Sequence, residues 1–233
     1  MKVKKGRGIE NIIFSFKGIL FKNKDIISGK ELYEERDISD ETRNKLISLK
    51  KLRKLNNIYY IWDYNKEFKK LIFSYKYDRR KSLSKIIAEL ITEEFYFILK
   101  EEKIDFVISV PINKKRENER GYNQVDEILK NLNIKYIEIK RIKNTEKMHK
   151  LLNEKLREEN IRGSFKIDSN LNLKNKKILL VDDIITTGST LREIKKSILN
   201  TLREEGKEYC SKTKIVVFCL AAAREIKINK GEV

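Results

Sequence analysis

The segment Asp182–Thr190 combines residue types that can bind a phosphorylated sugar. It joins the apolar run Ile178–Val181 to a helical pattern. Its glycine lets the backbone approach an anion closely, and its hydroxyls donate hydrogen bonds. The first N–H groups of the following helix have no intrahelical acceptor and carry partial positive charge. These features predict a monophosphate-binding loop made of Thr186, Thr187, Gly188, Ser189 and Thr190.

Two aspartates, Asp182 and Asp183, precede this loop directly. Their carboxylates would repel a phosphate, but they can accept hydrogen bonds from the vicinal hydroxyls of a ribose. Paired carboxylates can also hold Mg²⁺ together with substrate phosphates, and a helix-capping cluster without a ligand is the structural alternative. Thr190 and Glu193 fit a capping box, which predicts that the helix begins at the end of the loop.

A basic cluster follows a second apolar run, Phe106–Val110. If that run is a central strand, the cluster emerges at the carboxyl edge of the sheet, beside the phosphate loop. There its cations could stabilise negative charge on a leaving pyrophosphate, although a solvated loop would have the same composition. Asn123 and Gln124, which come next, could face the site or brace the following helix. The cluster consists of Lys114, Lys115, Arg116 and Arg120, introduced by Pro111.

The apolar runs are short and alternate with helical patterns, which predicts an α/β fold with a mostly parallel central sheet flanked by helices. Ligands bind such sheets beyond the carboxyl ends of the strands. The expected strands are 58–64, 106–110, 134–139, 178–181 and 215–220, and the expected helices are 83–99, 125–132 and 191–202.

Composition excludes several classes of protein. The 233 residues include 40% hydrophobic residues, one proline and two cysteines, which argues against disorder, a collagen-like chain and a disulfide scaffold. No apolar run approaches the roughly 18 residues of a membrane span, and no signal peptide is evident, so we expect a cytoplasmic globular protein without membrane insertion. The net charge of +18 attracts polyanions, but basic residues occur in nearly every segment, which favours composition over a nucleic-acid signature as the explanation of the charge.

Three stretches resemble one known family. Leu179–Thr190 resembles the phosphoribosyl pyrophosphate (PRPP) motif of type I phosphoribosyltransferases, and 110–124 and 157–165 are similar to the corresponding regions of ComF/GntX-type proteins. The resemblance implies a type I phosphoribosyltransferase fold. It also implies transfer of a phosphoribosyl group from PRPP with displacement of pyrophosphate and with Mg²⁺ bound to the substrate.

The same resemblance implies residue roles and an alternative function. Asp182, Asp183 and Arg120 are the predicted catalytic residues. Asp182 and Asp183 would hold the ribose hydroxyls, the loop 186–190 the 5′-phosphate, and the basic cluster, which includes Arg120, the pyrophosphate. The alternative is a ComF-type accessory factor of DNA uptake that binds single-stranded DNA or the competence machinery, with PRPP as a regulatory ligand or with a vestigial site. A homodimer is compatible with either function.

The chain departs from the family pattern at three places. Residues 1–80 contain no cysteine, so we expect no zinc ribbon and no structural zinc. Met148 stands where relatives often have glutamine, beside the lone His149. Because the given sequence has no room for a glutaminase domain and no cysteine nucleophile at its start, we expect no ammonia transfer from glutamine. Cys219 lies in an apolar run and is expected to be a buried small residue.

We therefore expect an N-terminal appendage or hood-like segment at 1–55 and a phosphoribosyltransferase domain at 56–233. The acceptor of the transferred group is not specified by these motifs. Residues 140–170 and the N-terminal segment are the candidates for gripping it.

Overall fold

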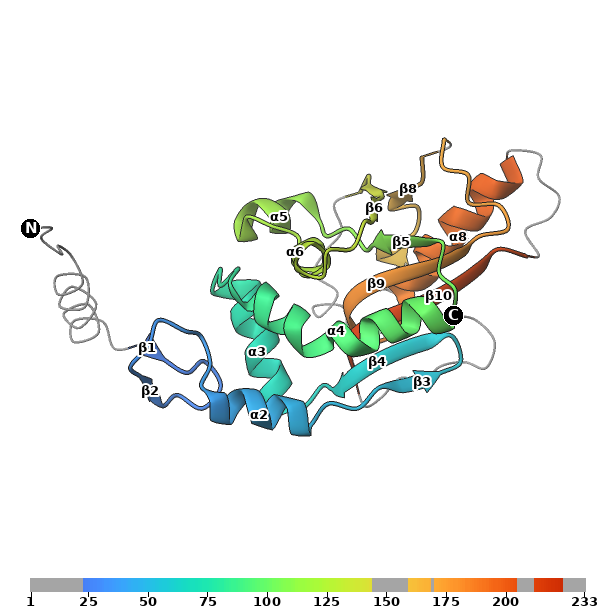
Figure 1. Cartoon of the computed structure of the whole chain (residues 1–233). Helices are drawn as coiled ribbons and strands as arrows, with labels where there is room; N and C mark the ends of the chain where they lie inside the picture. Colours follow the sequence, from blue (N-terminus) through green and yellow to red (C-terminus); the bar gives the residue numbers. More distant parts are fainter. Residues whose placement is uncertain (1–22, 144–158, 169, 205–211, 224–233) are drawn as a thin grey trace, which may run out of the picture. The chain divides into compact units, whose positions relative to one another are not determined.

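The computed structural model describes residues 23–143, 159–168, 170–204 and 212–223. The chain forms two compact units, Met1–Leu49 and Lys50–Val233 (Figure 1). The expected boundary after residue 55 lies between strands β3 (Arg53–Leu55) and β4 (Ile58–Asp63), which pair as an antiparallel hairpin.

In the described part of the first unit, a buried carboxylate organises the chain. The strands β1 (Asn23–Lys24) and β2 (Glu31–Leu32) pair antiparallel, and Ser39 caps helix α2 (Asp40–Ser48). Asp25 is 1% exposed and accepts hydrogen bonds from the backbone N–H groups of Ile27, Ser28 and Ser39. One acidic side chain thus ties the turn between the strands to the start of α2.

The second unit is built on a six-stranded sheet in the order β3-β4-β10-β9-β5-β6. All neighbouring pairs except β3–β4 are parallel, which confirms the predicted mostly parallel α/β sheet. The central strands are almost wholly buried, as expected for strands covered on both faces. Its remaining strands are β5 (Phe106–Ser109), β6 (Ile137–Glu138), β9 (Lys177–Ile185) and β10 (Lys214–Ala222). A small antiparallel pair, β7 (Lys140–Arg141) with β8 (Phe165–Lys166), stands apart from this sheet.

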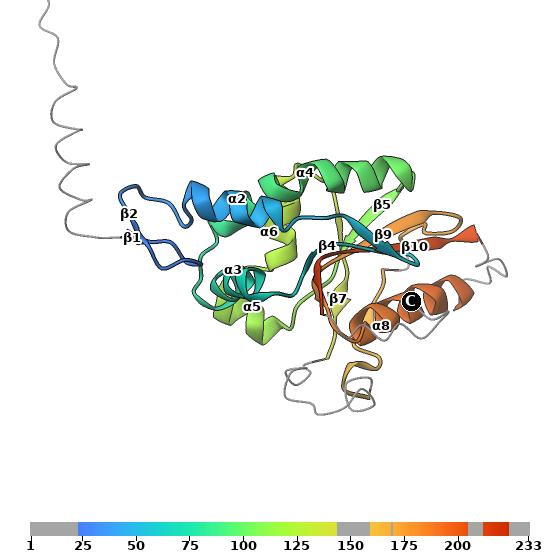
Figure 2. The same cartoon turned by 90° about the horizontal axis from the view of Figure 1, so that it is seen from below.

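Helices cover both faces of the sheet. In Figure 2 helix α4 (Leu83–Glu101) and helix α8 (Ser189–Glu204) lie on opposite sides of the strands. Phe95 of α4 meets Phe218 of β10 with ring centroids 5.2 Å apart. On the other face, Ile194 and Ile198 of α8 belong to the same apolar cluster as Cys219. Neighbouring residues of β10 therefore face opposite layers, as strand geometry requires.

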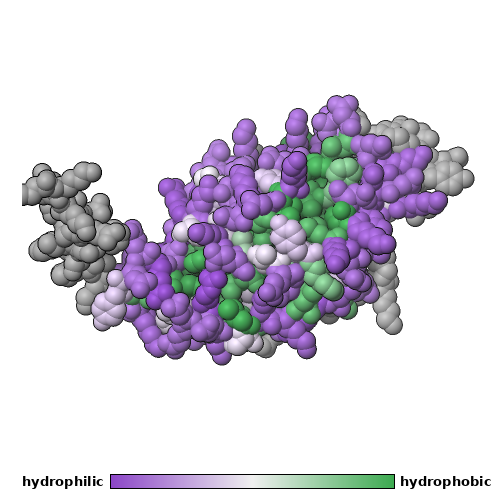
Figure 3. Space-filling model, viewed as in Figure 1, coloured by the Kyte–Doolittle hydropathy of each residue, from purple (hydrophilic) through white to green (hydrophobic). Residues whose placement is uncertain are grey.

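Three further helices of this unit lie between β4 and β6. They are α3 (Lys66–Tyr77), α5 (Lys114–Arg120) and α6 (Gln124–Asn131). Hydrophilic residues cover most of the face seen in Figure 3, while hydrophobic residues gather over α4 and the strands beside it. The predicted helices at 83–99, 125–132 and 191–202 correspond to α4, α6 and α8.

Strand β9 is longer than the sequence predicts. Its expected end was Val181, but the strand continues to Ile185, because β10 pairs with it in parallel as far as Ala222. Asp182 and Asp183 therefore lie inside the strand rather than in the loop behind it. Extended backbone fixes the directions of both carboxylates, which a loop would leave free.

Candidate functional site

The predicted phosphate loop forms the connection from β9 to α8. Gly188 adopts a positive φ of 75°, a conformation that favours glycine. The side chain of Arg192 reaches back and donates from Nη1 to the carbonyl of Thr187 (2.8 Å). The hydroxyls of Thr187 and Ser189 lie 3.1 Å apart. Together these contacts hold the loop around the start of α8.

A cavity of about 40 Å³ opens at this loop. All five predicted loop residues line it, and Asp182 lines it as well. The structure thus brings the hydroxyl donors, the helix N-terminus and one carboxylate to the same hollow. The cavity is lined by Asp182, Ile184, Ile185, Thr186, Thr187, Gly188, Ser189, Thr190 and Leu191.

The predicted capping box is wrong. Helix α8 begins at Ser189, and the backbone N–H of Arg192 donates to the carbonyl of Gly188, which places Gly188 at the N-cap. The carboxylate of Glu193 instead accepts from the backbone N–H of Gly163 (2.6 Å). Glu193 therefore ties the segment before β8 to α8.

The two aspartates point away from β9 on opposite sides, because successive side chains of a strand alternate. Asp182 lies in register with Cys219 and faces the α8 side, where the loop cavity is. Asp183 faces α3 and α6, and it is 5% exposed. Its backbone N–H donates to Oδ1 of Asp182 (2.8 Å). The sequence placed the two carboxylates together, whereas the structure gives them different neighbours.

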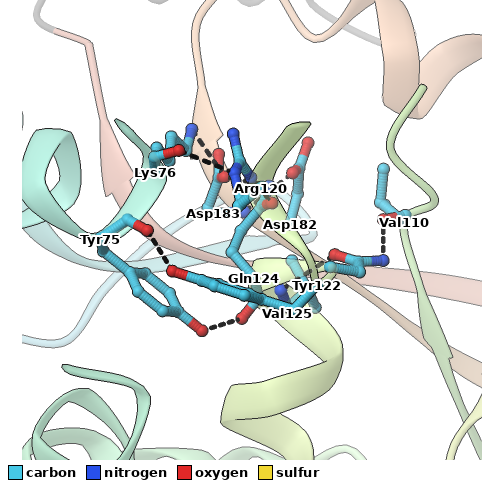
Figure 4. A network of polar contacts seen from close by, with 10 residues as sticks. Tyr75, Lys76, Val110, Arg120, Tyr122, Gln124, Val125, Asp182 and Asp183 are labelled. Atoms are coloured by element: carbon cyan, nitrogen blue, oxygen red, sulfur yellow. Dashed lines mark hydrogen bonds and ion pairs between the residues drawn. The ribbon is translucent and has the colours of Figure 1, made fainter. Parts of the chain in front are cut away.

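Asp183 is held by two side chains (Figure 4). The Nζ of Lys76 lies 2.6 Å from its Oδ2, and the Nε2 of Gln124 donates to the same oxygen at 2.5 Å. Lys76 belongs to α3 and Gln124 is the first residue of α6. Two helices thus converge on one carboxylate of β9.

Asp182 is the carboxylate of this pair whose pKa is raised. Burial raises its pKa to about 7, and the neighbouring charge of Asp183 adds to the shift. The positive charges of Lys76 and Arg141 oppose the shift without cancelling it. A carboxylate that titrates near neutrality in a hollow is typical of a functional site.

Arg120 is placed in the interior rather than with the solvent-facing cations. It is 8% exposed, its Nε donates to the carbonyl of Lys76 (2.9 Å), and its Nη1 donates to Oε1 of Gln124. Burial lowers its pKa from the ordinary arginine value. Arg120 therefore contacts the side chain of Gln124 and the backbone of Lys76, the two residues that hold Asp183 (Figure 4).

Two tyrosines support this cluster from below. The rings of Tyr75 and Tyr122 stack with centroids 5.4 Å apart, and the Tyr75 hydroxyl donates to the backbone carbonyl of Gln124 (2.7 Å). The Tyr122 hydroxyl donates to the carbonyl of Tyr75. The start of α6 is thereby fixed to the end of α3.

The other predicted cations lie at the same edge of the sheet. Asn113 caps α5 by accepting from the N–H of Lys115 (2.9 Å), and Lys114 and Lys115 are exposed, while Arg116 is half-buried. Pro111 is half-buried between β5 and α5, and its carbonyl accepts from Nη1 of Arg141 (3.4 Å).

The two open alternatives for Asn123 and Gln124 divide between the residues. Asn123 braces the helix: its Oδ1 accepts from the N–H of Val125 (3.1 Å), and its Nδ2 donates to the carbonyl of Val110 (3.4 Å). Gln124 enters the cluster around Asp183.

Sequence reasoning missed Lys76, Tyr75 and Arg141. Lys76 lies about a hundred residues before Asp183 and outside every motif, so only the amphipathic pattern of α3 could have drawn attention to that helix. Met148, His149 and Cys210 lie outside the described residues. Cys219 is fully buried, as predicted, and burial raises the pKa of its thiol.

The donor set does not fit a resident metal ion. Asp183 is already paired with Lys76, and in the part of the chain that the structure describes no group of three His, Cys, Asp or Glu side chains could hold a metal. Among the described helices none is long and apolar enough to cross a membrane.

Comparison with known proteins identifies the family. The family model PRTase-CE matches residues 53–230. The competence protein ComFC of Streptococcus pneumoniae is 31% identical over 138 residues, which are 58% of this chain and 59% of that protein. The DNA utilization protein YhgH of Shigella flexneri is 28% identical over 147 residues, 59% of this chain and 63% of that one. The match thus spans about three fifths of these relatives.

Among solved structures, adenine phosphoribosyltransferase of Saccharomyces cerevisiae aligns over 79% of this chain and 89% of its own, at 13% identity. Its TM-score of 0.34 is too low to support an argument about the site. The family assignment rests on the family model and on the curated relatives, and it agrees with the mostly parallel sheet described above. The chain belongs to the PRTase-CE family, a ComF-like family of the phosphoribosyltransferase type.

Proposed function

We propose that the protein binds PRPP with Mg²⁺ and transfers its phosphoribosyl group to an acceptor, displacing pyrophosphate. The observation that carries the proposal is the cavity at the end of β9, which Asp182 shares with the hydroxyls of the loop and the start of α8. A sugar phosphate needs this combination of an acceptor for hydroxyls and donors for a phosphate.

In the proposed reaction, the bond between C1 of the ribose and the pyrophosphate oxygen breaks, and the pyrophosphate leaves with the electron pair. The acceptor forms the new bond to C1 and gives up its proton. Cations positioned at the leaving group favour this step most in the transition state, when the negative charge develops. The exposed Lys114 and Lys115, with Arg116, would supply them from the first turn of α5.

The remaining residues are assigned positions around the sugar. The side chains and N–H groups of the loop would bind the 5′-phosphate, and Asp182 would accept from a ribose hydroxyl. Asp183 lies on the opposite side of β9, where Lys76 and Gln124 hold it. Its assigned role is likewise to accept from a ribose hydroxyl. Arg120 is a positioning residue in this proposal, because its Nε and Nη1 donate to the carbonyl of Lys76 and the side chain of Gln124.

Calorimetry with PRPP and Mg²⁺ tests the binding. We expect saturable binding by the wild type and its loss in the Asp182→Asn/Asp183→Asn variant. Asp105→Asn is the matched control, because it makes the same chemical change at the amino end of the sheet, beside Lys177. Equal binding by all three proteins, or none by the wild type, would overturn the proposal.

Transfer itself needs a separate measurement, because binding alone would also fit a regulatory ligand. Release of pyrophosphate from PRPP can be followed with purine and pyrimidine bases, with amines and with water alone. Release that depends on one of these acceptors would name the substrate class. Binding without release under all conditions would leave PRPP as a ligand and remove the transferase activity.

A second candidate function is a cytoplasmic accessory role in DNA uptake. Two observations favour it: the relatives named competence protein and DNA utilization protein, and the net charge of +18. Single-stranded DNA or other components of the uptake machinery would be the partners. Binding of single-stranded DNA over a salt series tests it, because each phosphate neutralised adds to the slope of log affinity against log salt. A slope near zero would remove the role.

A further inference from the structure

Helix α3 presents a pair of aromatic side chains to solvent. Phe73 is 57% exposed and Tyr77 is 54% exposed, and their ring centroids lie 4.9 Å apart. They are four residues apart on one face of the helix, whereas Phe68, Leu71 and Tyr75 are buried on the other. The buried face accounts for the packing of α3, so packing does not explain the exposed pair.

Positive charge is concentrated around this pair. Residues 66–85 contain eight Lys and Arg residues against two acidic ones, a balance of 8 − 2 = +6, which is one third of the net charge of the chain. Lys66, Lys69 and Lys70 are exposed in the turns before Phe73, and Arg79 is exposed just after Tyr77. The aromatic pair is therefore flanked by cations on both sides.

Part of this charge lies on side chains that contact neutral groups. The Nζ of Lys69 lies 5.0 Å from the ring centre of Tyr64, and Nε of Arg79 donates to the backbone carbonyl of Glu119 (3.1 Å). Lys76 and Lys81 are different, because they pair with Asp183 and Glu127. The charge that can attract a partner thus lies mainly at Lys66, Lys69 and Arg79.

We propose that this face of α3, defined by Phe73 and Tyr77 with Lys66, Lys69 and Arg79, binds single-stranded nucleic acid. The proposal rests on the second candidate function and gives it a surface. Unpaired bases stack on aromatic rings, and phosphates release counterions when lysine and arginine approach them. A helix of twelve residues is about 18 Å long, which suits a strand of a few nucleotides.

The chemistry distinguishes single strands from duplex. In a duplex the faces of the bases are stacked on each other and are not available to Phe73 and Tyr77. A duplex would contact only the cations. We expect it to bind more weakly than a single strand, with an affinity that depends on salt rather than on sequence. Stacking also tolerates every base, so we expect little sequence preference.

The proposal is tested by measuring the affinity for labelled oligothymidylate of fifteen nucleotides, and for a duplex of the same length, by fluorescence anisotropy. We expect the wild type to prefer the single strand, and Phe73→Ala/Tyr77→Ala to bind it at least about tenfold more weakly. Lys66→Gln/Lys69→Gln should keep the preference but lower the magnitude of the salt slope by about one.

Phe97→Ala is the matched control. Phe97 lies on α4 and is 52% exposed, so it offers the same exposed ring away from α3. We expect it to bind the oligonucleotide as the wild type does. Unchanged PRPP calorimetry for all variants would show that they are folded, since none of the altered residues lines the loop cavity.

The outcomes separate two failures. If the wild type binds oligothymidylate but the Phe73/Tyr77 variant binds equally well, the surface lies elsewhere and the DNA role stands. If Phe97→Ala weakens binding as much, the effect is not specific to α3 and the inference fails. If the wild type binds no oligonucleotide, or binds duplex equally well, the inference fails, and in the first case the DNA role fails with it.

Discussion

At the amino edge of the six-stranded sheet, Glu102 accepts hydrogen bonds from Lys54 (2.7 Å) and from the buried Tyr59 hydroxyl (2.6 Å). Lys214, at the start of β10, lies 3.4 Å away. At the carboxyl edge, Asp182 is next to a second carboxylate. Glu102 is thus paired with a cation and a hydroxyl, whereas Asp182 accepts one backbone hydrogen bond and lies beside another acid.

The pKa values follow this difference. Hydrogen bonds from Lys54 and Tyr59 lower the pKa of Glu102 to about 2, whereas burial and Asp183 raise the pKa of Asp182 to about 7. The amino edge stabilises its charge within the protein. At the carboxyl edge the surroundings disfavour the charge of Asp182, and this is the edge where ligands bind in parallel sheets.

The largest effect should come from Lys76→Met. Lys76 and Asp183 form a pair whose side chains are 17% and 7% exposed, so removal of the cation leaves a buried carboxylate without its ion-pair partner. We expect a loss of about 3 kcal/mol in the free energy of unfolding, measured by urea denaturation at pH 7.5.

The double variant Lys76→Met/Asp183→Asn checks the cause. Removal of both charges should recover most of the loss, since an uncharged pair can be nearly neutral. If the double variant is as unstable as Lys76→Met, then packing of the lysine stem matters more than its charge. The contrast in charge between the two edges would then not explain the loss.

A smaller effect is expected for Glu102→Gln, about 1–2 kcal/mol, because Lys54 and Lys214 are half-exposed and water compensates them in part. The pKa of Glu102 is lower in the folded state, so its contribution is present above about pH 4.5 and is lost as the pH falls toward 2. Urea denaturation at pH 7 and at pH 3 should therefore show a smaller difference at the lower pH. An equal difference at both would mean that the charge of Glu102 is not involved. PRPP binding should be unchanged.

The smallest effect, of opposite sign, is expected for Asp182→Asn. The raised pKa means that the wild type loses stability as the pH rises from about 4 to about 7. The variant lacks this loss, so at pH 8 it should be more stable than the wild type by on the order of 1 kcal/mol, with no gain at pH 4. Thermal unfolding at the two pH values measures the difference. A destabilised variant at pH 8 would show that Asp182 is satisfied by the protein after all.

Much of this architecture could be predicted because strand and helix patterns are local. The runs at 106–110, 178–181 and 215–220 became β5, β9 and β10, and the loop 186–190 lines a cavity, while phosphate binding by this loop stays a prediction. The end of β9 was missed, because an aspartate in a strand is unusual and only pairing with β10 extends it to Ile185.

The contacts across the site could not be predicted in the same way. Arg120 looks like a loop cation in the sequence, but α3 and α6 bury it. Glu193 fits a local capping box, but a tertiary contact with Gly163 takes it instead. Lys76 has no motif at all. Each of these three contacts depends on which helices pack together, and the pattern of a single sequence does not determine that packing.

The register of β9 and β10 has a practical consequence. Cys219 is completely buried and lies directly opposite Asp182, so a thiol reagent can reach it only when these strands separate. With Cys210 replaced by serine, the rate of labelling reports local opening of the sheet beside the phosphate loop. A ligand that binds only the closed sheet slows that rate in proportion to its occupancy. Cys219 thus serves as a native probe of opening next to the site, in a position where an attached dye would disturb the fold.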